Sequence, residues 1–185
     1  MSCFSGISAA ITNDCDNVPV GALEVVAYAF NRTDATFTVD GTDANKITEI
    51  TMAGGKKLYK VTAIKKETNG GFDLATADNL PNLFAHKIVL QPYVKTAAGI
   101  KNLDQMNDIC VVVELKGKKG EGSFVLLGAY SGLQLSSASG MFNDNNGIPT
   151  YEFSTREGEG EEFSRYIFHK TDYSVSKARL ETLTA

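Results

Sequence analysis

A run of polar residues at 143–146, Asn-Asp-Asn-Asn, offers side-chain oxygens of the kind that bind calcium. The spacing of an EF-hand is absent. If Gly147 is taken as the central glycine of such a loop, Phe142 and Phe153 fall at its first and last ligand positions. Asn146-Gly147 is also a strong signal for a tight turn between two strands. We therefore expect a turn and contact loop, with a different calcium geometry as the minority alternative.

Histidine and cysteine are too scattered for a zinc site. His86 and His169 lie far apart, and Cys3, Cys15 and Cys110 contain no C-x-x-C pair. The odd, widely spaced cysteines favour reduced thiols over a disulfide framework. His86 alternates with apolar neighbours, which predicts a core or interface residue, and the apolar run around Cys110 predicts an inert core thiol. We expect neither a metal nor a cofactor.

Short motifs of known catalytic sites fail on spacing. The Gly55-Lys56 pair would need a glycine five residues earlier to form a P-loop, and Ile50 stands there. The serine of GAYSG, at 128–132, is misplaced for a nucleophile elbow. Ser174 and Lys177 form an S-x-x-K string on a polar terminal segment without its companion motifs. These failures predict that the protein is not an enzyme.

The composition is that of one folded domain, 1–185. The chain has 185 residues, of which 43% are hydrophobic and 22% charged. It lacks an apolar run of the ~18 residues that a membrane helix needs and the basic start of a signal peptide, so we expect no membrane partner and a protein that stays inside the cell that makes it. A net charge of -4 argues against a protein that grips phosphates, although DNA can pass an acidic wall without sticking.

The apolar segments are short, alternate with a period of two and are separated by Gly, Asn and Asp, which is typical of antiparallel β proteins. Strands are expected at Gly21–Asn31, Ala35–Asp40, Lys46–Met52, Lys56–Thr68, Asn82–Val94, Cys110–Lys116, Gly122–Tyr130, Leu133–Ser139 and Pro149–Glu157. The third and fourth are expected to pair across Gly54-Gly55.

Helical spacing occurs in two places. Ile100, Leu103 and Met106 predict a helix from about Ala98 to Asp108, packed on the sheet. A second, short helix is expected near the C-terminus, capped by Thr171 or Asp172 and with Val175, Ala178 and Leu183 as a partial apolar stripe. The predicted fold class is mainly β: an antiparallel β-sandwich or partly closed barrel with one packed α-helix and a short C-terminal helix.

Three features exceed the needs of a solitary domain. They are an N-terminal arm of about residues 1–20 and two long hairpin-like segments, 65–82 and 140–163, rich in Gly, Asn and charge. The strand expected at 56–68 carries a lysine cluster, formed by Lys56, Lys57, Lys60, Lys65 and Lys66. We interpret this cluster as a solvated edge or, alternatively, as a contact for acidic residues of a second copy. The predicted inter-subunit contact residues are Lys56, Lys57, Lys60, Lys65, Lys66, Phe72, Asn143, Asp144, Asn145, Asn146, Glu157, Glu159, Glu161 and Glu162.

The order of these elements resembles the tail proteins of tailed bacteriophages, particularly tube-like proteins from phages of Bacteroides-type hosts. The resemblance is strongest in GLQLSSASG, at 132–140, and in the strand after NDNNG. It implies a β protomer that forms hexameric rings, which stack into a tail tube through which DNA passes without specific binding. It also implies a place in the virion tail, assembly in the host bacterial cytoplasm, and contacts with other tail or connector proteins.

The same resemblance implies that segments 65–79 and 141–149 are extensions between protomers or between rings. Within the structural class, the alternatives are a head-to-tail connector, a tail terminator or a capsid-decorating protein. A carbohydrate-binding β-sandwich is the alternative from another class. Such modules usually present exposed aromatic platforms, and the chain has no Trp.

Overall fold

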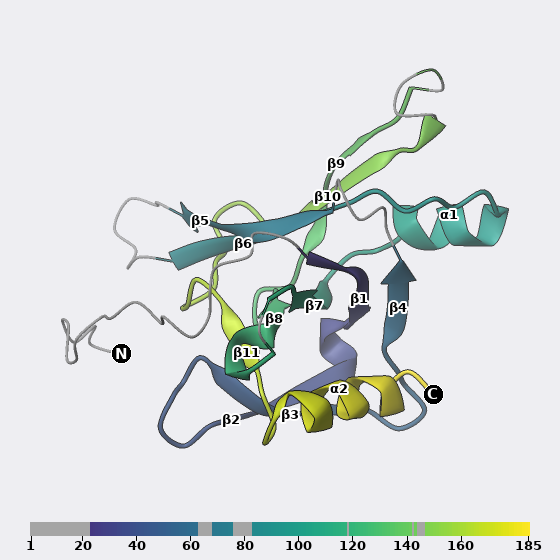
Figure 1. Ribbon diagram of the computed structural model, residues 1–185. Coiled ribbons are helices and arrows are strands. Elements are labelled where there is room, and N and C mark those ends of the chain that lie inside the picture. The colour runs from purple at the N-terminus through teal and green to yellow at the C-terminus, as the bar shows by residue number, and fades with distance from the viewer. Residues whose placement is uncertain (1–22, 63–67, 76–82, 118, 142, 144–146) are drawn as a thin grey trace.

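The protein consists of two packed β-sheets and two α-helices (Figure 1). The computed structural model describes residues 23–62, 68–75, 83–117, 119–141, 143 and 147–185. Within this part of the chain the sheets are mainly antiparallel, form a sandwich-like arrangement and do not close into a barrel. The expected mainly β fold is thus confirmed in its sandwich form. The N-terminal arm lies outside the described residues.

The described strands form one sheet of seven and one of four. The seven-stranded sheet contains, in spatial order, β2 (Ala35–Val39), β3 (Lys46–Met52), β11 (Tyr166–Phe168), β8 (Phe124–Leu127), β7 (Ile109–Leu115), β1 (Leu23–Asn31) and β4 (Tyr59–Thr62). The four-stranded sheet contains β5 (Asn69–Ala75), β6 (Leu83–Leu90), β10 (Thr150–Ser154) and β9 (Gln134–Ser139). The helices are η1 (Arg32–Asp34), α1 (Ala97–Asp104), η2 (Glu121–Ser123) and α2 (Tyr173–Thr182).

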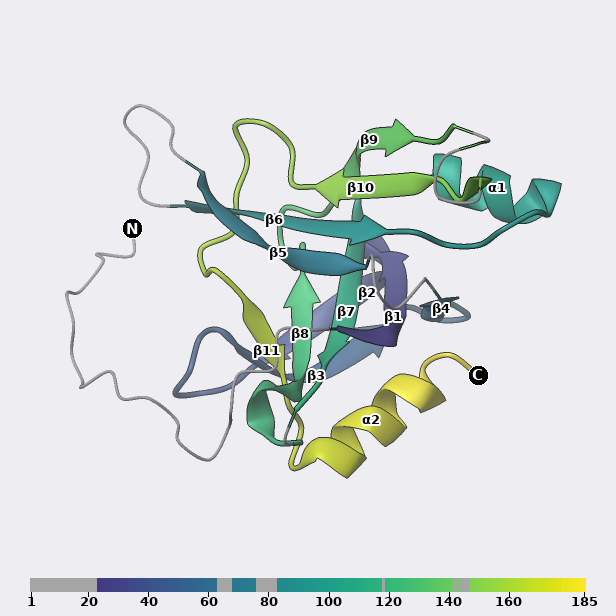
Figure 2. The ribbon, with the colours of Figure 1, turned by 45° about the horizontal axis from the view of Figure 1, so that its top comes forward.

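The seven-stranded sheet is covered on both faces, which explains the unbroken apolar run of β7. Val111 and Val113 point into the core shared with the four-stranded sheet. Cys110 and Val112 point into a second core, which includes Leu180 of α2. Figure 2 shows α2 on the side of this sheet opposite the four-stranded sheet. A strand buried on both faces has no solvent-facing positions, so it loses the alternation of a surface strand.

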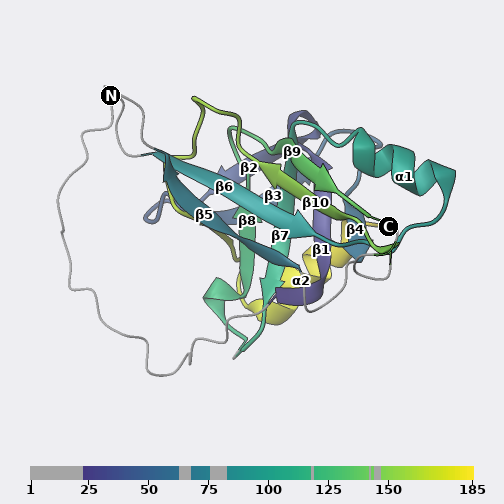
Figure 3. The ribbon, with the colours of Figure 1, turned by 90° about the horizontal axis from the view of Figure 1, so that it is seen from above.

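The four-stranded sheet is covered on one face only (Figure 3). In β6 the buried residues His86, Ile88 and Leu90 alternate with the partly exposed Lys87 and Val89. This is the pattern expected for a sheet with one face on the core and the other toward solvent.

Strands β9 and β10 pair with each other, and β10 also pairs with β6 from Tyr151 to Ser154. The far end of the β9–β10 pair, with the described residues that follow it, projects beyond the body of the molecule (Figure 1). We call this unit the ribbon.

The predicted pairing of the third and fourth strands is wrong. Gly55, at φ +77°, does make a turn in which the Lys56 amide donates to the Ala53 carbonyl at 2.9 Å. However, both sides of β3 are occupied, by β2 and by β11. Leu58 is buried in the second core, and its amide donates to the Leu183 carbonyl at 2.9 Å. The chain therefore leaves β3, and β4 pairs antiparallel with β1.

The helices also differ from expectation. Helix α1 begins after Thr96, whose side chain accepts from the Gly99 amide, and ends at Asp104, so it is shorter than predicted. Leu103 is buried, but Ile100 is 41% exposed. Asp172 caps α2 as expected.

The predicted apolar stripe of α2 is wrong for Val175 and Ala178, whereas Leu183, just after the helix, packs against the second core as expected. Ser176 and Leu180 are the buried residues of α2, whereas Val175 and Ala178 are exposed. Leu180 and Tyr173 contact the second core, and the polar network described below also attaches the helix.

Two described strands were not anticipated. β5 lies inside the segment 65–82, which was expected to be a hairpin-like extension, and pairs with β6 over its whole length. β11 has three residues and pairs parallel with β3 and antiparallel with β8. The predicted tight turn at Asn146-Gly147 lies partly outside the described residues, because Asn146 does. β9 ends at Ser139 and β10 begins at Thr150, so the connection is longer than two residues. Gly147 does have a positive φ, of +75°.

Candidate functional site

The predicted lysine cluster is divided among different environments. Lys56 lies 3.5 Å from the Asp34 carboxylate, and Lys60 forms an ion pair with Glu181 of α2. Lys57 is exposed, and Lys65 and Lys66 lie outside the described residues. Two of these lysines thus have acidic partners within the same chain. The structure therefore fits the solvated-edge interpretation of Lys56 and Lys60 better than a shared basic contact patch.

Phe72 lies on β5, at one edge of the four-stranded sheet. Its ring is 38% exposed and packs edge to face against Phe84, with centroids 5.7 Å apart. The Arg165 guanidinium lies 5.8 Å from the same ring. Leu74, two residues along the strand, is more exposed still, at 52%. These side chains give this edge apolar area that a partner can cover.

The acidic segment after β10 contains three exposed glutamates and one buried glutamate. Glu157, Glu159 and Glu162 are exposed, as is Asn143 of the ribbon tip. Asp144, Asn145 and Asn146 lie outside the described residues. Glu161 differs from its predicted role as a subunit contact because it is fully buried. Its neighbours in the acidic run face water, whereas Glu161 points inward.

Glu161 anchors the acidic segment to two parts of the fold. Its carboxylate accepts from the Tyr130 amide at 3.1 Å and from the Ser131 amide at 2.9 Å. Its backbone exchanges two hydrogen bonds with Phe84 of β6, each of 2.9 Å. The buried charge is therefore compensated by backbone donors, as a buried carboxylate requires.

His86, also fully buried, fastens the same segment from β6. Its Nδ1 accepts from the Gly128 amide at 3.1 Å, which leaves Nε2 to donate to the Phe163 carbonyl at 2.9 Å. This arrangement needs a neutral ring. Burial lowers the pKa of His86, and the charge of Glu161 opposes that shift. The expectation of a satisfied core histidine is confirmed.

The side chains of the S-x-x-K string do not contact each other in a catalytic arrangement. The Ser174 hydroxyl donates to Asp172 at 2.6 Å, whereas Lys177 contacts Glu114 and the Tyr173 hydroxyl. Cys110 is buried and donates to the Gly128 carbonyl, and burial raises the pKa of its thiol. Among the residues that the structure describes, no group of three His, Cys, Asp or Glu side chains is placed to hold a metal ion.

A polar network attaches α2 to the seven-stranded sheet. Glu114 of β7 accepts from Lys119 at 2.7 Å and from the Tyr173 hydroxyl at 2.6 Å. Burial raises the pKa of Glu114, but these two hydrogen bonds and the charges of Lys119 and Lys177 together outweigh it, so the pKa is lowered overall. The Tyr28 hydroxyl donates to Glu181 at 2.7 Å. These charges have their partners within the chain, so the network serves the fold.

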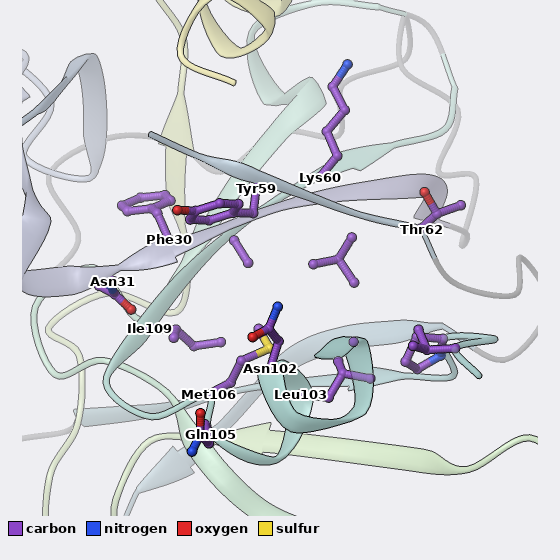
Figure 4. Close-up of a pocket in the computed structure, with 15 residues that line it drawn as sticks. Phe30, Asn31, Tyr59, Lys60, Thr62, Asn102, Leu103, Gln105, Met106 and Ile109 are labelled. Carbon is purple, nitrogen blue, oxygen red and sulfur yellow. The ribbon is translucent and has the colours of Figure 1, made fainter. Parts of the chain in front are cut away.

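A pocket of about 560 Å³ lies between α1 and the β1–β4 end of the seven-stranded sheet (Figure 4). Its apolar lining comprises Ala29, Val61, Val94, Leu103, Met106 and Ile109. The exposed amide side chains of Asn31, Asn102 and Gln105 also line it. Tyr59 stands at its side with 60% of its surface exposed. The sandwich is incompletely filled here, because α1 replaces the second sheet at this end.

The positions of the free sheet edges could not be predicted from the local sequence pattern. In the described part of the chain, β5 and β9 each pair on one side only, as do β2 and β4. The residues of β9, QLSSAS, contain neither charge nor proline. That composition is unusual for an edge, where lysine or proline commonly prevents association. The order of strands within a sheet depends on residues far apart in the sequence. Local alternation therefore predicted the strand β9 but not its place at the edge of the sheet.

Comparison of the chain with protein-family models, with curated proteins and with solved structures gave no match. None of the described helices is long and apolar enough to cross a bilayer. Inferences about function therefore depend on the residues and surfaces described above.

Proposed function

We propose that the protein is a structural subunit that associates with copies of itself into rings, and that these rings stack into a tube of the kind found in phage tails. The observation that carries the proposal is the four-stranded sheet, whose described edges β5 and β9 are both free. The link to phage tails comes from the sequence resemblance, and the mode of association comes from the sheet.

The two free edges suit each other as partners. β9 presents small neutral residues, and β5 carries one charged residue, Asp73, which already pairs with Lys87 at 2.5 Å. Neither strand therefore has an unpaired charge that would repel an added strand. Adding β9 of one copy to β5 of the next would continue the sheet through backbone hydrogen bonds. Such a contact joins two different surfaces, and it closes into a ring when the rotation between copies allows.

The solvent-facing side of this sheet suits a surface past which DNA slides. Asp73, Lys87 and Glu152 alternate with inward-pointing neighbours and so lie on this face. The described strand residues of the face contain a single lysine, and Arg156, just after β10, donates to Gln134 of β9 at 3.0 Å. A face of this kind offers few partners for phosphates, so we expect no tight binding of DNA.

The proposal is tested by light scattering coupled to size-exclusion chromatography, followed by negative-stain electron microscopy, on purified protein over a range of concentrations. We expect closed rings and, at higher concentration, tubes of constant diameter. Closed rings that never stack would favour the connector or terminator role. A monomer at every concentration would overturn the proposal.

A further inference from the structure

The pocket between α1 and β4 and the exposed tip of the ribbon have complementary chemistry. At the tip, Met141 is 69% exposed, the highest value among the large hydrophobic residues described. Asn143 follows it, also exposed. The pocket offers the reverse arrangement, an apolar floor with exposed amides beside it. An apolar side chain flanked by an amide therefore finds both kinds of partner in the pocket.

The pocket has room for such a side chain. Its volume of about 560 Å³ lies within the ~300–1,000 Å³ that is usual for binding pockets. Methionine is well suited to fill an irregular apolar hollow, because its side chain is unbranched and polarizable. Met106 and Leu103 of α1 already form part of the lining, so an inserted methionine would pack against similar groups.

The ribbon of the same chain is not placed to fill the pocket. The Tyr151 hydroxyl donates to Asp104 of α1 at 3.3 Å, which holds the start of β10 beside the helix. From there the ribbon extends away from the body, and Figure 1 shows β4 on the other side of α1. The occupant that fits these positions is the tip of a second copy.

We propose that Met141 at the ribbon tip of one subunit inserts into the pocket between α1 and β4 of another subunit. This contact rests on the proposed self-assembly and adds a second, separate interface to the pairing of β5 with β9. Tip and pocket are different surfaces, so the contact is heterologous and propagates from copy to copy. A tip that extends beyond the body suits a contact between stacked rings.

Cysteine pairing between chains tests the insertion. In a background with Cys3 and Cys15 replaced by Ser, one chain carries Met141→Cys and a second carries Gln105→Cys at the pocket. After mixing, assembly and mild oxidation, we expect a disulfide-linked heterodimer on a non-reducing gel. A mixture of Met141→Cys with Ser174→Cys, on the exposed side of α2, is the control and should give no such band.

Blocking the pocket provides an independent test. Asn102 is an exposed residue of the pocket, so Asn102→Trp should fill the opening without disturbing the core. We expect Asn102→Trp and Met141→Ser each to raise the protein concentration needed for stacking by about tenfold or more. Lys101→Trp, next to the pocket and also exposed, should have little effect.

The outcomes separate the two proposals. Rings that stack normally in both variants, with no heterodimer, would overturn the insertion and leave assembly through the sheet edges intact. A disulfide formed within a single chain carrying both cysteines would show that the tip reaches its own pocket, and would also overturn the insertion. Absence of any assembly by the parent protein would overturn both proposals.

Discussion

The two sheets of the molecule place their apolar and polar residues in different ways. The seven-stranded sheet is buried on both faces, and the charges around it, such as Glu114 and Glu181, have partners within the chain. The four-stranded sheet has one solvent-facing side, free described edges and a projecting ribbon. The difference indicates a division of roles, in which the first sheet stabilises the fold and the second presents surfaces for other subunits.

The largest expected difference concerns aromatic residues of the two sheets. Phe124 is fully buried in the seven-stranded sheet and stacks on Tyr173, with centroids 5.4 Å apart. Phe124→Ala should lower the free energy of unfolding by about 3–5 kcal/mol, because it leaves a cavity. Phe72→Ala, on the exposed edge of the other sheet, should cost less than about 1 kcal/mol. Urea unfolding measures both, and equal losses would refute the division of roles.

Adjacent glutamates provide the next comparison. Glu161→Ala removes the acceptor of two backbone amides, which would then be buried without partners, so we expect a loss of about 2–3 kcal/mol in the free energy of unfolding. Glu162→Ala, at the exposed neighbouring position, should change that free energy by no more than about 0.5 kcal/mol. Similar losses in both variants, measured by urea unfolding, would show that Glu161 is not an anchor.

The stability of this anchor should depend on pH. Because burial lowers the pKa of His86, the unfolded chain binds a proton more readily than the folded chain. The contribution of the neutral ring is therefore complete above the ordinary histidine pKa of about 6.5 and is lost as the pH falls below it, by up to about 1.4 kcal/mol per pH unit. Thermal unfolding between pH 7 and pH 5 measures the slope.

A variant identifies the source of that slope. His86→Gln should flatten the dependence between pH 7 and pH 5. The lowered pKa values of Glu49, Glu114 and Glu181 cause a separate loss of stability, below the ordinary glutamate pKa of about 4.3. An unchanged slope in His86→Gln would exclude this histidine as the titrating group.

Charges placed on the free edge of β9 should change stability least and assembly strongly. Ser137→Lys together with Ser139→Lys places two charges on β9, in the way that natural sheet proteins protect free edges. The free energy of unfolding should change by no more than about 0.5 kcal/mol, since both residues are exposed. Sedimentation velocity should show loss of rings. Ser174→Lys on α2 is the matched control, and intact rings in the β9 variant would contradict the role of this edge.

The sequence predicted the fold where local alternation decided it. The strands β1, β3, β6 and β10 lie inside their expected ranges, and β7 begins one residue before its range, because period-two alternation or an unbroken apolar run marks them. The pairing of β4 was missed because it depends on Leu58, whose burial under α2 involves the far end of the chain. The three-residue β11 is too short to carry a pattern of its own.

The candidate surfaces were less predictable than the strands. The acidic run after β10 was identified by its composition, but composition does not distinguish Glu161, which faces inward, from Glu162, which faces water. The pocket combines residues from β1, β4, α1 and the segments next to α1, so no short stretch of sequence marks it. Likewise, Met141 is exposed only because the ribbon extends beyond the body, which is a property of the whole fold.

Hydrogen-deuterium exchange, followed for the same protein before and after assembly, tests most directly whether the four-stranded sheet joins the subunits. The account predicts slower exchange of amides in β9 and β5 on assembly, because an added strand would bond the free edge of each, with no change in β7, which is paired on both sides already. Equal exchange of β9 and β5 amides in free and assembled protein would contradict it.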